Sequence, residues 1–109
     1  MSLDAALEVE SGDPVTFALT VTNAGDDPRE LTFRSGLDAD FAVSRDGEEC
    51  WRWSDGRMFT QALRTETVAP GESRTYTETW EPPESGTYTA VASLNTMETT
   101  VEEHAEFVI

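Results

Sequence analysis

Apolar and polar residues alternate with a period of two through most of the chain, and this pattern limits the fold more than any other feature. In the segment from Pro14 to Asn23, the apolar residues at every second position are Val15, Phe17, Leu19 and Val21. Successive side chains of a β-strand point to opposite faces of a sheet, so this spacing predicts a strand with one buried face. No segment has the 3.6-residue period of a convincing long helix, which predicts an all-β protein.

The same alternation, interrupted by turn residues, predicts further strands. They are Ala5–Val9, Leu31–Phe33, Phe41–Val43, Cys50–Trp53, Ser73–Trp80, Ser85–Leu94 and Thr99–Ile109. Asp46-Gly47 is a strong hairpin signal, and Ser54-Asp55-Gly56 is a second turn of the same kind. Phe59–Leu63 fits either a single helical turn or an extended bridge, so we expect it to be irregular. About eight or nine short strands separated by such turns predict an immunoglobulin-like antiparallel β-sandwich.

The length and the single cysteine bound the class of protein. With 109 residues, the chain suits one domain spanning residues 1–109. No segment approaches the roughly 20 apolar residues of a membrane span, so no membrane partner is expected. Cys50 is alone, so there is no internal disulfide, and we expect its side chain to be a small buried hydrophobe rather than a nucleophile. A cytoplasmic location is the expectation, with an exported protein whose leader was removed as the alternative.

The charge is strongly acidic and contains no lysine. Asp and Glu number 22 against seven basic residues, all of them arginine, which gives a net charge of −15. This composition is typical of a salt-accumulating organism, where a Debye length of about 3 Å in molar salt screens repulsion between surface carboxylates. An acidic face that binds a basic partner is the alternative, but it predicts clustered carboxylates, and here they are scattered. The chain has no basic patch, which excludes nucleic acid as a partner.

Nothing in the sequence indicates an enzyme. Carboxylate pairs are expected by chance in so acidic a chain, and Asp38-Ala39-Asp40 lacks the spacing of a calcium loop. One cysteine and one histidine, His104, cannot build a His/Cys metal site or a Ser-His-Asp relay. Phosphate loops, nucleophile elbows and zinc motifs are missing as well. We therefore expect no catalytic residues, no metal and no cofactor.

Five segments between Val15 and Leu94 follow one another in the order of a known family. They read VTNAGDDP, LTFRSGLDADFAV, WRWSDGRMFTQAL, VAPGESRTYTETW and SGTYTAVASL. Their pattern resembles the intracellular proteinase inhibitor family known as BsuPI, and the acidic surface suggests a halophilic archaeal-type member. The most specific element pairs Ser35-Gly36 and Asp40-Phe41 with Trp53-Ser54 and Phe59-Thr60-Gln61-Ala62. The resemblance implies an immunoglobulin-like fold and inhibition of an intracellular subtilisin-like serine protease.

A protein that inhibits a protease needs an exposed, rigid segment that enters the cleft, within an interface of about 1,600 Å². The segment after the second turn fits this need, and the candidate protease-binding residues are Trp51, Ser54, Asp55, Gly56, Arg57, Met58 and Phe59. Subtilisin-like enzymes generally accept large apolar groups in the first specificity pocket, so Met58 or Phe59 is the expected anchor. The alternative is that both side chains fold back as core.

The tryptophans are open to the same two interpretations. Trp51 and Trp53 lie two apart on a predicted strand and so face the same way, either into the core or toward a partner. We expect Trp53 to be buried and Trp51 to be partly exposed, with Trp80 in the core or covering a sheet edge. Two functions from different classes remain: a protease inhibitor, and a non-inhibitory immunoglobulin-like protein interaction module. The oligomeric state is not predicted.

Overall fold

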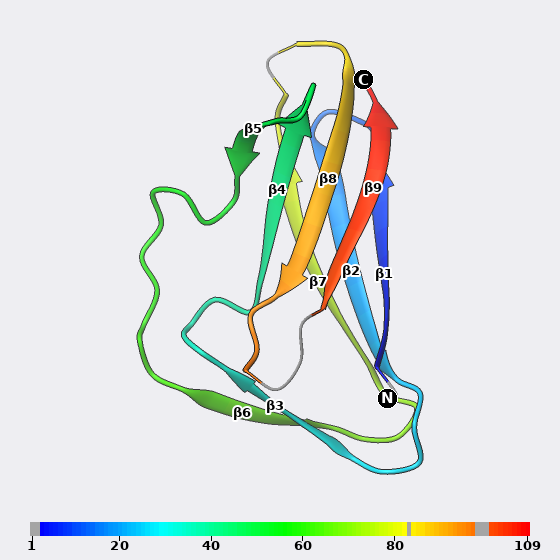
Figure 1. The fold of residues 1–109 in the computed structure, drawn as a ribbon, viewed down its shortest axis with the longest axis vertical. Helices are drawn as coiled ribbons and strands as arrows, with labels where there is room; N and C mark the ends of the chain where they lie inside the picture. Colours follow the sequence, from blue (N-terminus) through cyan, green and yellow to red (C-terminus); the bar gives the residue numbers. More distant parts are fainter. Residues whose placement is uncertain (1–2, 83, 98–100) are drawn as a thin grey trace.

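The protein is built from β-strands. The computed structural model describes residues 3–82, 84–97 and 101–109. Within these residues lie nine strands: β1 Leu3–Glu10, β2 Val15–Asn23, β3 Arg29–Phe33, β4 Ala39–Arg45, β5 Glu48–Arg52, β6 Arg64–Val68, β7 Ser73–Trp80, β8 Thr87–Leu94 and β9 Glu102–Val108 (Figure 1). The predicted all-β class is confirmed. The predicted beginning of the last strand, at Thr99, falls outside the described residues.

Two antiparallel sheets face each other, and a two-stranded ribbon crosses one end. The first sheet has the order β1-β2-β7, the second has the order β5-β4-β8-β9, and β3 pairs with β6. Figure 1 shows the ribbon beneath the two sheets, and β1 running beside β9 at one edge. Two sheets with this strand order form an immunoglobulin-like sandwich, as the turn spacing predicted.

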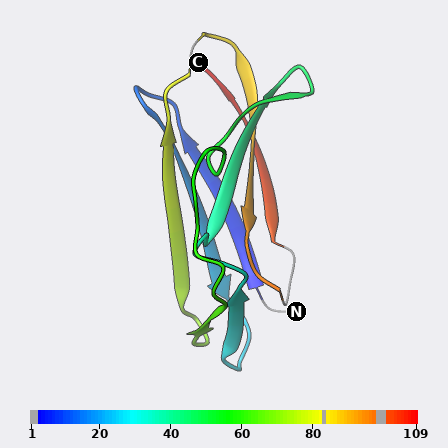
Figure 2. The same ribbon diagram turned by 90° about the vertical axis from the view of Figure 1, so that its left-hand side faces the viewer.

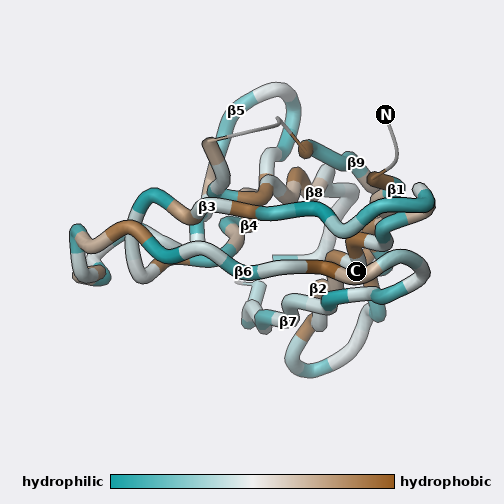
Figure 3. Tube along the Cα trace, turned by 90° about the horizontal axis from the view of Figure 1, so that it is seen from below, coloured by the Kyte–Doolittle hydropathy of each residue, from teal (hydrophilic) through white to brown (hydrophobic). Residues whose placement is uncertain are grey.

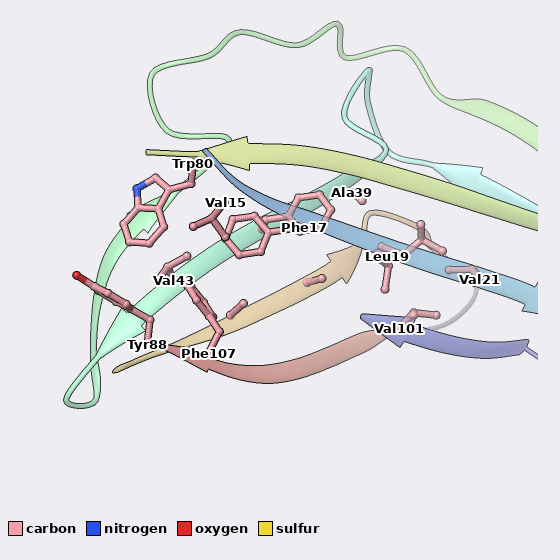
Figure 4. Close-up of a cluster of buried hydrophobic side chains, with 14 of the residues drawn as sticks. Val15, Phe17, Leu19, Val21, Ala39, Val43, Trp80, Tyr88, Val101 and Phe107 are labelled. Atoms are coloured by element: carbon pink, nitrogen blue, oxygen red, sulfur yellow. The ribbon is translucent and has the colours of Figure 1, made fainter. Parts of the chain in front are cut away.

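The core fills the space between the two sheets. The four alternating apolar residues of β2, Val15, Phe17, Leu19 and Val21, are at most 1% exposed, so the predicted alternation is confirmed. Phe17 lies at the centre, with its ring centroid 6.0 Å from that of Phe41 and 5.8 Å from that of Phe107. Trp80 is buried against Tyr88 and Phe107, which confirms it as a core residue (Figure 4). Polar and apolar residues interleave along the trace instead of separating into blocks (Figure 3).

The hairpin between β4 and β5 forms at the predicted turn. Asp46 and Gly47 have φ angles of 53° and 82°, the left-handed values that a two-residue hairpin turn requires. Cys50 lies on β5, which is an edge strand, and its side chain is exposed. The prediction that Cys50 is buried is therefore wrong: Trp51, the next residue, stacks on Phe17 in the core, and successive side chains of a strand point to opposite faces.

Strand β6 was not predicted. Its sequence, Arg64 to Val68, alternates charged residues with threonine, and only Val68 is buried. A pattern search for apolar alternation finds nothing in such a strand. It forms because β3 offers it a complete antiparallel partner, from Arg29 opposite Val68 to Phe33 opposite Arg64. None of the described residues forms a helix long and apolar enough to cross a membrane.

We expect the fold to weaken when salt is removed. The net charge of −15 makes unscreened carboxylates repel one another at low ionic strength. From molar to millimolar sodium chloride, the free energy of unfolding should fall by at least about 1 kcal/mol, or roughly 4–8 °C in Tm, measured by circular dichroism. The dependence of Tm on salt should shrink near pH 4, where roughly half of ordinary carboxyl groups are protonated. Equal Tm values in high and low salt at pH 7 would count against adaptation to salt.

Candidate functional site

The chain between β5 and β6, residues 53–63, leaves the edge of the sandwich as a long connection without a strand of its own (Figure 1). Figure 2 looks onto this connection from the side. It contains the turn at Ser54-Asp55-Gly56 and the irregular stretch Phe59–Leu63, both as predicted. Met58 is 98% exposed, and Leu63 is 63% exposed. Met58 is therefore not part of the core.

Ser54, the first residue after Trp53, is fixed to the sandwich by the carboxylate of Asp40. Asp40 lies on the inner strand β4 and is only 9% exposed. Its Oδ1 accepts hydrogen bonds from the backbone N–H groups of Ser54, at 3.1 Å, and Phe41, at 2.9 Å. Its Oδ2 accepts from the Ser54 hydroxyl at 2.6 Å and from Arg52 Nη1 at 3.2 Å. Two of these four donors belong to Ser54, so the carboxylate holds the start of the connection by the backbone and the side chain of one residue.

Trp53 holds the residues on both sides of Met58. Its own N–H donates to the carbonyl of Phe41 at 2.8 Å, which fixes it to β4. Arg57 Nε donates to the Trp53 carbonyl at 2.7 Å, and the guanidinium lies over the indole, 4.4 Å from its centroid. On the other side, the ring centroid of Phe59 lies 5.8 Å from that of Trp53. Met58 is consequently presented to solvent between two held neighbours.

The turn that leads to Met58 is closed by its own backbone. The N–H of Asp55 donates to the Arg52 carbonyl at 3.1 Å, and the N–H of Arg57 donates to the Ser54 carbonyl at 3.2 Å. Gly56 has a φ of 76°, in the left-handed region that favours glycine. The sequence Ser54-Asp55-Gly56 therefore supplies the conformation that turns the chain outward.

Gly36 fixes the far side of the same segment. Its N–H donates to the Thr60 carbonyl at 2.9 Å. A Cβ at this position would lie 2.9 Å from Thr60 Oγ1 and 3.3 Å from Thr60 N. Glycine is therefore needed for the close approach of the two segments, since any side chain would push Thr60 away.

Arg64 ties the end of the connection to the turn between β3 and β4. It forms an ion pair with Asp38, donates to the Ser35 carbonyl, and lies over the Phe33 ring at 4.8 Å from the centroid. The hydrogen bond with Asp38 raises the pKa of Arg64, so the guanidinium of Arg64 stays positively charged. Asn95 supports the same turn, with Nδ2 donating to the Leu37 carbonyl at 2.8 Å.

A pocket of about 290 Å³ lies between the connection and β7. Its lining includes the aromatic rings of Phe41, Trp53, Phe59 and Tyr76 and the carboxylate of Glu78. Burial raises the pKa of Tyr76 to about 12 and also raises the pKa of Glu78, although Arg57 and a hydrogen bond with Trp53 act against the second shift. The connection is thus held by specific contacts at its ends, at Trp53 and at Thr60, rather than by continuous packing on the sheet.

Trp51 and Trp53 differ from expectation in one respect. Trp51, opposite Val43, stacks on Phe17 and Trp80 with centroid distances of 6.0 and 5.7 Å, and its partial exposure is confirmed. Trp53 is only half-buried, so the prediction that it is buried is wrong. Strand β5 ends at Arg52, and the indole that follows packs against the margin of the core on one side and against Phe59 and Arg57 of the connection on the other.

Six of the seven candidate residues are consecutive in the chain, and we call this segment, Ser54–Phe59, the candidate loop. Trp51 is separate, because its ring lies against the core. Sequence reasoning missed the role of Asp40, which was treated as a chance member of an acidic pair. The available signal was its position: an acid flanked by Ala39 and Phe41 in an otherwise apolar strand needs donors nearby.

We expect Gly36→Ala to loosen the candidate loop and to destabilise the fold. The new methyl group would collide with Thr60 Oγ1, so Thr60 and its neighbour Phe59 must shift. The free energy of unfolding should fall by about 1 kcal/mol, because a hydrogen bond is lengthened or lost. Thermal unfolding followed by circular dichroism would measure this loss.

A second substitution tests the cause. Thr60→Ala removes the atom that the Gly36→Ala methyl group meets first, at 2.9 Å, so the double variant should recover part of the lost stability. Additive losses in the double variant would show that contact with Thr60 Oγ1 is not the reason for glycine at this position.

An exposed loop anchored to an inner strand of an immunoglobulin-like sandwich is an arrangement that many binding domains use to contact their partners. The described residues contain no group of three or more His, Cys, Asp or Glu side chains placed to hold a metal ion. The family model described as intracellular proteinase inhibitor, BsuPI, matches residues 3–99. The chain therefore belongs to the BsuPI family of proteinase inhibitors, and it is not an enzyme.

Solved structures support the fold. The sporulation control protein Spo0M of Bacillus subtilis is similar with a TM-score of 0.55 and 15% identity, over 100% of this chain and 49% of that one. A β-glucuronidase of Bacteroides uniformis is similar with a TM-score of 0.50 and 14% identity, over 98% of this chain and 13% of that one. This chain thus spans half or less of the length of these structures, and the likeness concerns the fold alone. No curated protein matches the chain.

Proposed function

We propose that the protein inhibits a subtilisin-like serine protease in the cytoplasm by placing the candidate loop, Ser54–Phe59, in the protease cleft. One observation carries the proposal: Met58 is 98% exposed, while the residues before and after it are both held on Trp53. Family membership supplies the general activity. The exposed loop supplies a means by which this chain could exert it.

The contacts of the candidate loop favour tight binding. Association costs free energy for each side chain and loop that becomes ordered, about 0.5–1.5 kcal/mol per flexible side chain. Here the turn, the two hydrogen bonds from Ser54 to Asp40 and the stacking on Trp53 order the loop before it meets a partner. The unbranched side chain of Met58 is free to enter an apolar specificity pocket. Burying such a side chain contributes about 1.5–3 kcal/mol.

Titration against a subtilisin-like protease tests the proposal. Peptide hydrolysis is followed in molar salt while the protein is added up to and beyond one equivalent, and circular dichroism verifies the β fold. A stoichiometric fall in hydrolysis is the expected result. An unchanged rate with folded protein would instead favour the alternative, a non-inhibitory immunoglobulin-like interaction module.

A further inference from the structure

We infer that Met58–Phe59 is a reversible cleavage site: the target protease cuts this bond, both new ends stay on Trp53, and the protease rejoins them. The inference rests on the proposed function and adds a mechanism to it. It begins from the arrangement of three consecutive residues. Arg57 and Phe59 both contact Trp53, and Met58 between them faces solvent.

Each side of the bond has more than one attachment. Before it, Arg57 Nε donates to the Trp53 carbonyl at 2.7 Å, and Ser54 is held on Asp40. After it, Phe59 stacks on Trp53, and the Thr60 carbonyl accepts the Gly36 N–H at 2.9 Å. None of these contacts uses the Met58–Phe59 peptide group. Cutting that bond leaves all of them in place.

The chemistry balances with water as the only co-reactant. The protease serine attacks the Met58 carbonyl, the carbon–nitrogen bond breaks, and the Phe59 nitrogen leaves as an amine after gaining a proton. Water then releases the Met58 carboxylate from the serine ester. In the reverse direction, the serine attacks that carboxylate with loss of water, and the Phe59 amine attacks the ester to restore the peptide bond.

Retention of the amine determines which reaction prevails. In an ordinary substrate the leaving peptide diffuses away, and hydrolysis becomes irreversible. Here Phe59 stays beside the ester because its ring and the next residue are held, which gives the amine a high effective concentration against water. The loop is therefore processed slowly and occupies the cleft during both reactions. The protease that fits this site accepts an unbranched apolar side chain before the bond and an aromatic one after it.

The test uses a catalytic amount of the inhibited subtilisin-like protease with the full-length protein, followed by mass spectrometry. We expect a single cut after Met58, adding the mass of one water, and a stable mixture in which intact and cleaved chains differ by less than about tenfold. Purified cleaved protein, treated with fresh protease, should return to the same mixture. Inhibition without this cut, a cut that runs to completion, or cleaved protein that never rejoins would overturn the inference while leaving the proposed function standing. Absence of inhibition in the titration would overturn both.

Arg57→Ala gives a sharper comparison. It removes the contact with the Trp53 carbonyl and indole, so the mixture should shift toward the cleaved form by about tenfold. Arg34→Ala removes the same charge from another exposed arginine and should leave the mixture unchanged. A purely structural role for Arg57 would alter Tm without moving the ratio of intact to cleaved chains, and that result would also overturn the inference.

Discussion

Met58→Asp is expected to weaken inhibition of the target protease at least about 100-fold, or close to 3 kcal/mol of binding free energy. An aspartate entering an apolar specificity pocket must lose its hydration without gaining a partner. The wild-type side chain is 98% exposed, so the substitution removes no packing from the free protein. The inhibition constant from peptide hydrolysis in molar salt should rise steeply, while Tm by circular dichroism stays nearly constant.

Met97→Asp is the matched control. Met97 follows β8 and is 55% exposed, so it offers the same residue type and the same change in charge outside the candidate loop. Its inhibition constant should equal that of the unaltered protein. If both variants weaken inhibition equally, added negative charge rather than loss of the Met58 anchor is the cause. If Met58→Asp inhibits as well as the unaltered protein, the anchor lies elsewhere.

The sandwich could be predicted from the sequence because most strands carry their burial pattern in their residues. Strand β2 alternates buried and half-buried side chains along its whole length, and β8 does so from Tyr88 to Leu94. Strand β6 could not be found in this way. It is held by pairing with β3 and contributes only Val68 to the core, so the information that specifies it lies in its partner.

The candidate loop was located from the turn at Ser54-Asp55-Gly56 and the large residues after it, but its anchors were not predicted. Each anchor joins residues far apart in the chain: Asp40 with Ser54, and Gly36 with Thr60. No local pattern indicates that an acid in β4 will face a turn fourteen residues later. The prediction that Trp53 is buried was wrong for a related reason: strand β5 ends at Arg52, one residue before Trp53.

The segments that carry the most specific family resemblance meet at this one place. Gly36 contacts Thr60, Asp40 binds Ser54, and the carbonyl of Phe41 accepts the N–H of Trp53. The residues of the motif therefore hold a loop in place and are not a set of reactive groups. Because none of these residues projects with Met58, the exposed residue can differ without disturbing the anchors. Under the proposed function, target preference would depend on residue 58, whereas the order of the loop depends on these anchors.

Asp40→Ala should have the largest effect on the anchored loop. The substitution leaves the Ser54 and Phe41 N–H groups, the Ser54 hydroxyl and one Arg52 donor without their shared acceptor. Unpaired groups at a nearly buried site cost about 2–3 kcal/mol in stability. Inhibition should fall at least about tenfold beyond what the unfolded fraction explains, since the loop must now be ordered during binding. Urea unfolding and inhibition kinetics on the same sample would measure both losses.

Two control variants test whether the effect of Asp40→Ala is specific to the acceptor at this position. Asp40→Asn keeps one carbonyl oxygen that can accept from Ser54, so it should lose less stability and less inhibition than Asp40→Ala. Asp4→Ala removes the same side chain from an exposed position on β1 and should change neither quantity. If Asp40→Ala lowers stability by the expected amount but inhibits normally once folded, the hydrogen bonds to Ser54 stabilise the sandwich alone. The order needed for inhibition would then come from Trp53, because its contacts with Arg57 and Phe59 flank Met58 directly.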